Sequence, residues 1–163
     1  MVCLAKHTAK EKYEKRTINY WCNMIRVFKE KDLNEVAEMW LNTNIKAHSF
    51  IPADYWQDNF EPVKEMFLQA EIYVYETAGK IQGFVGLDNN YIAGIFVRTE
   101  SQSKGICKQI LDYVKAIKSE LSLNVYKKNV RAVQFYQREN FKILDENIDE
   151  NTNEIEYLMM WKK

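Results

Sequence analysis

The order of apolar patterns along this chain predicts an α/β protein with a mixed central sheet and helices on both of its faces. Alternation of apolar and polar residues, typical of half-buried strands, recurs between segments that have apolar residues at helical spacing. The 163 residues, 47% of them hydrophobic, match the size of one domain and can bury a sizeable core. Five glycines and two prolines give no indication of low complexity or disorder.

The first part of the fold is predicted as a strand followed by two helices. Residues 25–28 alternate as a strand does, and Asp32 followed by Glu35 has the spacing of a capping box at a helix start. Pro52 precedes the second helix. The apolar residues at helical spacing are Leu33, Val36, Ala37, Trp40 and Leu41 in the first helix, and Tyr55, Trp56, Phe60, Val63, Met66 and Phe67 in the second.

Three strands are expected next, followed by alternating helices and strands. The three strands are residues 72–76, 81–87 and 91–97, with turns at 79–80 and 88–90. A helix over residues 105–119 then buries one apolar stripe, formed by Ile106, Ile110, Val114 and Ile117. The order ends with a strand at 121–126, a helix at 129–139 and strands that start at Phe141 and Ile155.

The loop over residues 102–107 is the most informative segment. It reads Gln-Ser-Lys-Gly-Ile-Cys, it follows an apolar strand, and a helix begins at its glycine. Such a loop directs several unpaired backbone N–H groups toward one spot, where the helix dipole adds partial positive charge. That arrangement suits a pyrophosphate, but an ordinary strand-to-helix turn also contains glycine.

A second motif follows in residues 121–141. After a short strand, Asn129 stands where it can cap a helix, an aromatic pair lies within that helix, and Asn140 stands at its exit. Asn tolerates the left-handed conformation that a helix exit requires. The spacing Asn-x-x-Ala-x-x-Phe-Tyr-x-x-x-x-Phe is carried by Asn129, Ala132, Phe135, Tyr136 and Phe141.

Taken together, the loop and this second motif resemble the GNAT superfamily of N-acetyltransferases, whose cofactor loop runs Gln/Arg-x-x-Gly-x-Gly/Ala. The resemblance covers residues 24–161 and extends to small bacterial members of the family through residues 39–41, 48–51 and 55–56. It implies a sheet of about seven strands. The parallel strands that end at Val97 and Tyr126 are then splayed, and the pantetheine arm of acetyl-CoA inserts between them.

The resemblance also implies where acetyl-CoA binds. Backbone groups of residues 95–97 would pair with pantetheine, and N–H groups of residues 103–108 would hold the pyrophosphate. Gly105 allows the backbone to approach the phosphates closely. The complete predicted set is Ile95, Phe96, Val97, Gln102, Ser103, Lys104, Gly105, Ile106, Cys107, Lys108, Asn129 and Tyr136.

Some residues of this loop have two interpretations. Cys107 stands where the family has Gly or Ala; a thiol at a helix N-terminus can have a lowered pKa, but Cys also serves as a small core residue. Lys104 and Lys108 either add charge near the phosphates or are simply solvated.

Two side chains are predicted to move protons. By resemblance, Tyr136 protonates the CoA thiolate as it leaves; the alternative is a core residue of an amphipathic helix. The strand over residues 91–97 has no acidic residue, so the base comes from elsewhere or the amine loses its proton through water. His48 is the candidate side chain, because it lies between the first two helices, where the resemblance places the acceptor, and because neutral imidazole suits that task; the alternative is a structural histidine. The residues predicted to contact the acceptor are His48, Phe50, Tyr55, Trp56 and Tyr91, with Asp88 considered beside them.

The predicted function is transfer of acetyl from acetyl-CoA, in a ternary complex and without a metal, to a small amine, a peptide N-terminus or a protein lysine. The absent carboxylate keeps open a second function, a CoA- or acyl-CoA-binding sensor module. A nucleotide-binding domain is disfavoured, since Gly-x-x-x-x-Gly-Lys-Ser/Thr does not occur. CoA thiol release would separate enzyme from sensor.

Composition adds expectations about partners and compartment. Three separated cysteines and no apolar run of about 20 residues favour a cytoplasmic protein that contacts no membrane. The whole chain has 23 basic and 23 acidic residues, and residues 1–23 contain five of the basic and two of the acidic ones. The remaining residues are therefore mildly acidic, with 18 basic and 21 acidic side chains, which argues against a nucleic-acid partner.

We predict a monomer or homodimer with one catalytic domain at 24–163. Residues 1–23 are an extension, or alternatively a helix that packs through Ile18, Tyr20 and Trp21.

Overall fold

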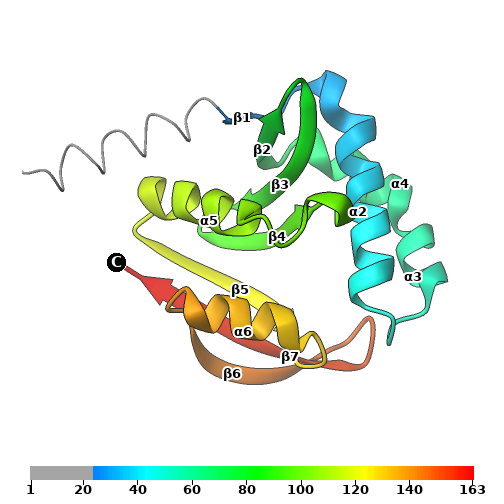
Figure 1. Ribbon diagram of the computed structural model, residues 1–163. Coiled ribbons are helices and arrows are strands. Elements are labelled where there is room, and N and C mark those ends of the chain that lie inside the picture. The colour runs from blue at the N-terminus through cyan, green and yellow to red at the C-terminus, as the bar shows by residue number, and fades with distance from the viewer. Residues whose placement is uncertain (1–23) are drawn as a thin grey trace, which may run out of the picture.

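The computed structural model describes residues 24–163, so both predictions about residues 1–23 lie outside the described residues. Strands and helices follow one another in the predicted order, with the second predicted helix divided in two (Figure 1). The strands are β1 (Ile25–Val27), β2 (Glu71–Thr77), β3 (Lys80–Asp88), β4 (Tyr91–Val97), β5 (Glu120–Tyr126), β6 (Lys142–Asp149) and β7 (Glu154–Lys162). The helices are η1 (Glu30–Asp32), α2 (Leu33–Ala47), α3 (Ala53–Asp58), α4 (Phe60–Phe67), η2 (Thr99–Ser101), α5 (Ile106–Ile117) and α6 (Val130–Arg138).

The seven strands form one mixed sheet in the order β1-β2-β3-β4-β5-β7-β6, which confirms the predicted sheet. All neighbours are antiparallel except β4 and β5. In the described chain, the register of this parallel pair is the single match of Tyr91 with Ser122, whereas β5 and β7 match over seven residue pairs. The parallel strands therefore diverge beyond Tyr91 and leave the splayed gap that the family resemblance implies.

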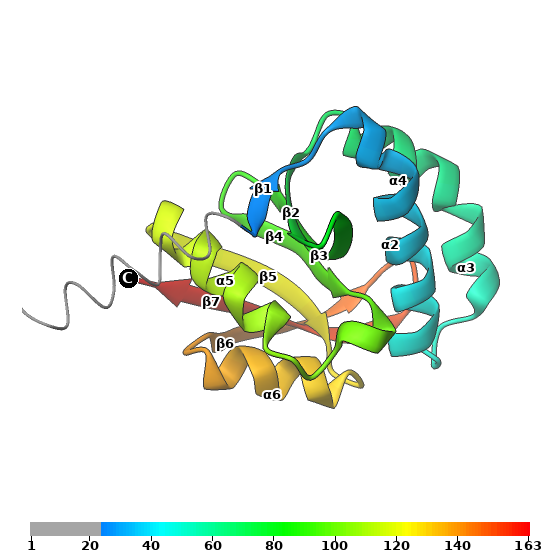
Figure 2. The same ribbon diagram turned by 45° about the horizontal axis from the view of Figure 1, so that its top comes forward.

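Helices cover both faces of the sheet (Figures 1 and 2). Helices α5 and α6 pack on one face, in a core cluster that includes Ile110, Val114 and Met159. Helices α2, α3 and α4 pack on the other, in a second cluster that includes Trp40 and Phe84. None of the helices in the described part of the chain is long and apolar enough to cross a membrane.

The predicted stripe of α5 is correct at three positions and wrong at the fourth. Ile106, Ile110 and Val114 are buried, but Ile117 is 46% exposed. Helix α5 ends at Ile117, so this side chain lies at the last turn, and Leu111 fills the core instead.

The predicted capping box does not form. Asp32 accepts a hydrogen bond from the Lys29 backbone N–H at 2.8 Å and pairs with Arg26 at 2.7 Å. Glu35 pairs instead with Arg98 at 2.6 Å. Both carboxylates are thus used by tertiary ion pairs, and the 3-10 turn η1 precedes α2.

The second predicted helix is divided into α3 and α4 at Asn59. Pro62 explains the division, because its ring would clash with the carbonyl of Asp58 four residues earlier in a continuous helix. At the exit of α6, by contrast, Asn140 has φ +66°, which confirms the predicted left-handed exit.

Candidate active site

The loop before α5 has the backbone form of an anion site. Gly105 and Ser103 both have positive φ, +79° and +61°. The N–H of Gln109 donates to the Gly105 carbonyl at 3.0 Å, so the N–H groups of residues 106–108 precede the helical hydrogen bonds of α5. A Cβ added to Gly105 would come no nearer than 4.0 Å to the described protein, so the space beside this glycine belongs to a cavity.

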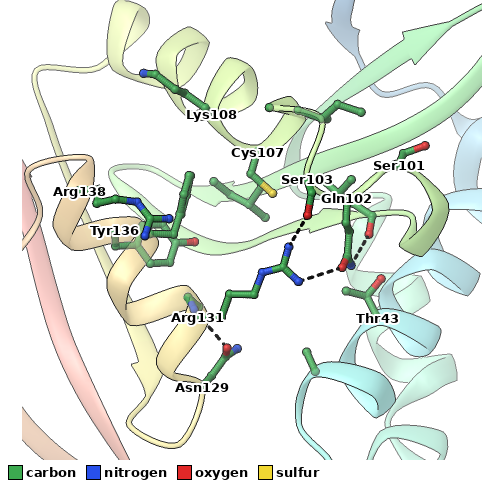
Figure 3. A pocket seen from close by; sticks show the side chains of 17 residues that line it. Thr43, Ser101, Gln102, Ser103, Cys107, Lys108, Asn129, Arg131, Tyr136 and Arg138 are labelled. Atoms are coloured by element: carbon green, nitrogen blue, oxygen red, sulfur yellow. Dashed lines mark hydrogen bonds between the residues drawn. The ribbon is translucent and has the colours of Figure 1, made fainter.

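That cavity has a volume of about 420 Å³ and lies between the loop, α6 and the end of β4 (Figure 3). It brings together ten of the twelve residues predicted for acetyl-CoA: Ile95, Val97, Gln102, Ser103, Gly105, Ile106, Cys107, Lys108, Asn129 and Tyr136. Lys104 is outside its lining, and the ring of Phe96 stacks on Phe84 and lines a second cavity instead.

Arg131 crosses the first cavity and was missed in the sequence. Its guanidinium lies 3.1 Å from Ser103 Oγ and 3.5 Å from Gln102 Oε1. Dashed lines mark both contacts in Figure 3. The sequence signal that could have indicated Arg131 is its position two residues after Asn129, the N-cap of α6. The ammonium of Lys108 is instead paired with Asp112 at 3.0 Å and with Glu139 at 3.2 Å. Of these two cations, Arg131 is therefore the one directed at the cavity.

The second cavity, about 280 Å³, lies where the end of α2 meets β4, β5 and β7. His48, Trp56 and Tyr91, all predicted to contact the acceptor, line it. Phe50 and Tyr55 do not: they pack edge-on against Tyr126 and Trp56, respectively. Asp88, the last residue of β3, is also outside its lining.

Four residues line both cavities, namely Ile95, Asn129, Ala132 and Tyr136. The cavities therefore meet in the gap between β4 and α6. A molecule that fills the first cavity and another that fills the second would touch at Tyr136.

His48 is held as a neutral ring at this junction. The side-chain oxygen of Asn129 caps α6 by accepting from the backbone N–H of Ala132, with 3.2 Å between nitrogen and oxygen. The other end of the same amide, its nitrogen, therefore faces His48 Nε2, also at 3.2 Å. Nε2 is then the acceptor, and the proton lies on Nδ1, which is buried without a partner in the described chain. Burial lowers the pKa of His48 to about 4, although the Asn44 carbonyl acts in the opposite direction. The ring also stacks on Trp56, with centroids 5.4 Å apart.

Tyr136 is 8% exposed, and its phenol oxygen points into the first cavity (Figure 3). Burial is the main cause that raises its pKa, and Cys107 and Tyr91 add to the shift. The phenol therefore stays protonated at neutral pH. Burial raises the pKa of Cys107 as well, which favours the structural interpretation of this thiol over a redox role.

Glu156, on β7, was also missed. It lines the second cavity beside Tyr91 and Asn124. Its position gave no signal in the sequence, because the register of β5 with β7 decides which of its side chains reach the cavity.

The comparisons with known proteins agree with this geometry. The family model described as the acetyltransferase (GNAT) domain matches residues 42–163. Peptidyl-lysine N-acetyltransferase YiaC of Escherichia coli (strain K12) is 34% identical over 140 residues, which are 85% of this chain and 96% of the relative. The chain therefore belongs to the GNAT acetyltransferase family.

Two solved structures share the fold. The apo-form of YjaB from Escherichia coli has a TM-score of 0.76 at 20% identity and is covered to 95%, against 84% of this chain. The yncA acetyltransferase of Salmonella typhimurium, solved with its cofactor acetyl-CoA, has a TM-score of 0.59 at 13% identity, over 92% of its length and 85% of this chain. The predicted resemblance to small bacterial YiaC/YjaB-type acetyltransferases is confirmed, and the chain is an acetyltransferase of this fold.

Proposed function

We propose that this chain transfers acetyl from acetyl-CoA to the side-chain amine of a lysine in a protein or peptide, in the cytoplasm and without a metal. The observation that carries the proposal is the junction of two cavities at Tyr136. A donor in one cavity and an acceptor in the other then meet directly, so no covalent enzyme intermediate is needed. The relatives named peptidyl-lysine N-acetyltransferases support lysine as the acceptor.

The first cavity fits the donor. Its loop offers backbone N–H groups at a helix N-terminus, the place where phosphate groups bind most readily. Arg131 adds a forked cation, which pairs with phosphate through two donors. The gap between β4 and β5 offers unpaired strand edges to an extended chain such as pantetheine.

The second cavity fits the acceptor. The rings of Trp40, Trp56 and Phe96 line it and offer apolar walls for the methylene stem of a lysine. A peptide N-terminus has no such stem between its amine and its backbone, so these walls favour a lysine side chain over a peptide N-terminus. A small diamine has a comparable stem, and against it the support for lysine is the name of the relatives.

Tyr136 is proposed as the general acid that protonates the departing sulfur. A pKa raised by burial keeps the proton in place until the sulfur develops negative charge. The prediction that His48 takes the amine proton stays a prediction. A ring with a pKa near 4 is a weak base, and its Nε2 already accepts from Asn129.

Incubation with acetyl-CoA and an acceptor panel tests the function. The panel contains three acceptors. The first is a lysine-containing peptide with a blocked N-terminus, the second is the same peptide with arginine in place of lysine and a free N-terminus, and the third is a small diamine. Lysine acetylation is expected, seen as CoA thiol release and a mass increase on the blocked peptide. Acetylation of only the other two acceptors would contradict it. Acetyl-CoA binding without thiol release would support the sensor module instead.

A further inference from the structure

We propose that Glu156 binds the ammonium group of the acceptor and removes its proton. This assignment rests on the proposed function, since it concerns the cavity that would hold the lysine. Glu156 lies on β7, the strand beyond β5 in the sheet. Strand β4, in contrast, has no acidic residue that could act as the base.

The sheet register places Glu156 at the acceptor cavity. It lies directly opposite Tyr126 of β5, and directly opposed residues of antiparallel strands project to the same face. Asn124, two residues before Tyr126, shares that face. All three line the second cavity together with Tyr136, the proposed acid.

The carboxylate is held in place but has no cation. The Asn124 amide donates to Glu156 Oε1, which orients the group. Among the residues that the structure describes, no ammonium or guanidinium pairs with Glu156, whereas Glu154, two residues earlier on the same face, is paired with Lys128 at 2.8 Å. A half-buried acid without a cation in a cavity for a cationic acceptor is a natural partner for that acceptor.

The surroundings of Glu156 favour proton uptake. Burial first, and then the charge of Asp149 on β6, raise its pKa above the usual value. Tyr91 from β4 and Tyr126 from β5 face it as neutral phenols, since the pKa of each is raised. His48, in the same cavity, is neutral and adds no cation. A carboxylate of raised pKa is a better base than an ordinary one.

The lysine ammonium gives one proton to Glu156, which passes it to solvent. The amine nitrogen then forms a bond to the thioester carbonyl carbon, and the C–S bond breaks with its electron pair on sulfur. The second proton lost by nitrogen reaches sulfur through the phenol of Tyr136. The products are acetyl-lysine, CoA thiol and one proton in solution.

The test is the pH profile of Glu156→Gln on the blocked lysine peptide, with Glu154→Gln as the matched control. We expect kcat to fall about 100-fold or more in Glu156→Gln. We also expect wild type to have an acidic limb in kcat/KM, and this limb to disappear in Glu156→Gln. Acetyl-CoA affinity should stay within about twofold of wild type, which shows an intact fold. Glu154→Gln should behave as wild type in every measurement.

Three results would overturn the assignment. One is a kcat of Glu156→Gln within threefold of wild type with its acidic limb retained. Another is a raised acceptor KM at unchanged kcat, which makes Glu156 a binding group only. The third is loss of the limb in His48→Gln while Glu156→Gln keeps it. If wild type acetylates only another amine of the panel, lysine specificity fails, but the same variants on that amine still test Glu156.

Discussion

The Asn129 amide nitrogen lies 3.2 Å from Nε2 of His48, while the oxygen of the same amide caps α6. The Asn129 side chain thus connects His48, at the end of α2, with the first turn of α6, and this contact lies at the junction of the two cavities. Because the cap fixes which end of the amide faces His48, it also fixes the tautomer of the ring. A protonated His48 would place a donor against a donor and break this tie.

His48→Gln should reduce the loss of stability in acid. The folded pKa of His48, near 4, lies below the ordinary value of 6.5. Between these values the unfolded chain binds more protons, so the free energy of unfolding falls as the pH drops through this window. We expect His48 to account for about 2 kcal/mol of the loss by pH 4.5, or roughly 4–8 °C in Tm.

Thermal melts of wild type and His48→Gln from pH 7 to 4.5 measure this difference. Glutamine keeps an oxygen that can accept from Asn129, so the two proteins should have similar Tm at pH 7. Asp32 and Asp149, whose pKa values are lowered, lose stability in acid equally in both proteins. Parallel Tm curves would show that His48 does not titrate as proposed.

Gly105→Asn and Gly105→Val should both weaken acetyl-CoA binding about 100-fold or more, because either side chain enters the space where phosphate would meet the backbone. This is the loss of two charge-assisted hydrogen bonds at ~1.5–3 kcal/mol each. The two variants differ in stability: Asn tolerates the φ of +79°, but Val does not and should lower Tm by several degrees. Calorimetric titration and thermal melts measure both quantities. Wild-type affinity in the Asn variant would disprove the phosphate assignment.

Arg131→Ala should weaken acetyl-CoA binding about 10- to 100-fold, the range for one hydrogen bond to a charged group. Lys108→Gln is the matched control and should change it less than threefold, because the Lys108 ammonium is already paired with Asp112 and Glu139. Added salt should reduce the difference between Arg131→Ala and wild type. Equal losses in the two variants would indicate a diffuse charge effect rather than a contact of Arg131.

Tyr136→Phe should reduce turnover at least tenfold, since loss of a general acid costs about 10²–10⁴ in rate. The ring that packs on Phe141, with centroids 5.4 Å apart, is retained, so acetyl-CoA affinity and Tm should stay near wild type. Single-turnover rates measure the chemical step. A rate within twofold of wild type would make Tyr136 a packing residue.

The residues that line the first cavity, which we propose for the donor, could be predicted from the sequence because their signals are local. The loop at 102–107 combines a glycine, a helix start and a preceding strand within a few residues, and Asn129 caps the helix that it begins. The predicted strands all form within the described residues. Helical spacing did not show the break at Asn59, because an apolar stripe continues across it; Pro62 was the signal.

The acceptor side depends on contacts between distant residues. Tyr91, His48 and Glu156 meet through the pairing of β5 with β7 and the packing of α2 on the sheet. No single segment reveals which of them share a cavity. Arg131 is an intermediate case: it lies near a recognised motif, but its direction follows from contacts with Ser103 and Gln102 in a loop 28 residues away.

The single residue pair between β4 and β5 makes the sheet an incomplete structure in the free protein. On the proposed binding mode, pantetheine supplies the missing hydrogen bonds, so the backbone amides at the gap should exchange slowly with deuterium only when acetyl-CoA or CoA is bound. Binding to the folded state alone also raises its stability by RT ln(1 + [L]/Kd). On this binding mode, the strand edges are paired with pantetheine from the binding of acetyl-CoA until CoA dissociates, so kcat should not exceed the dissociation rate of CoA.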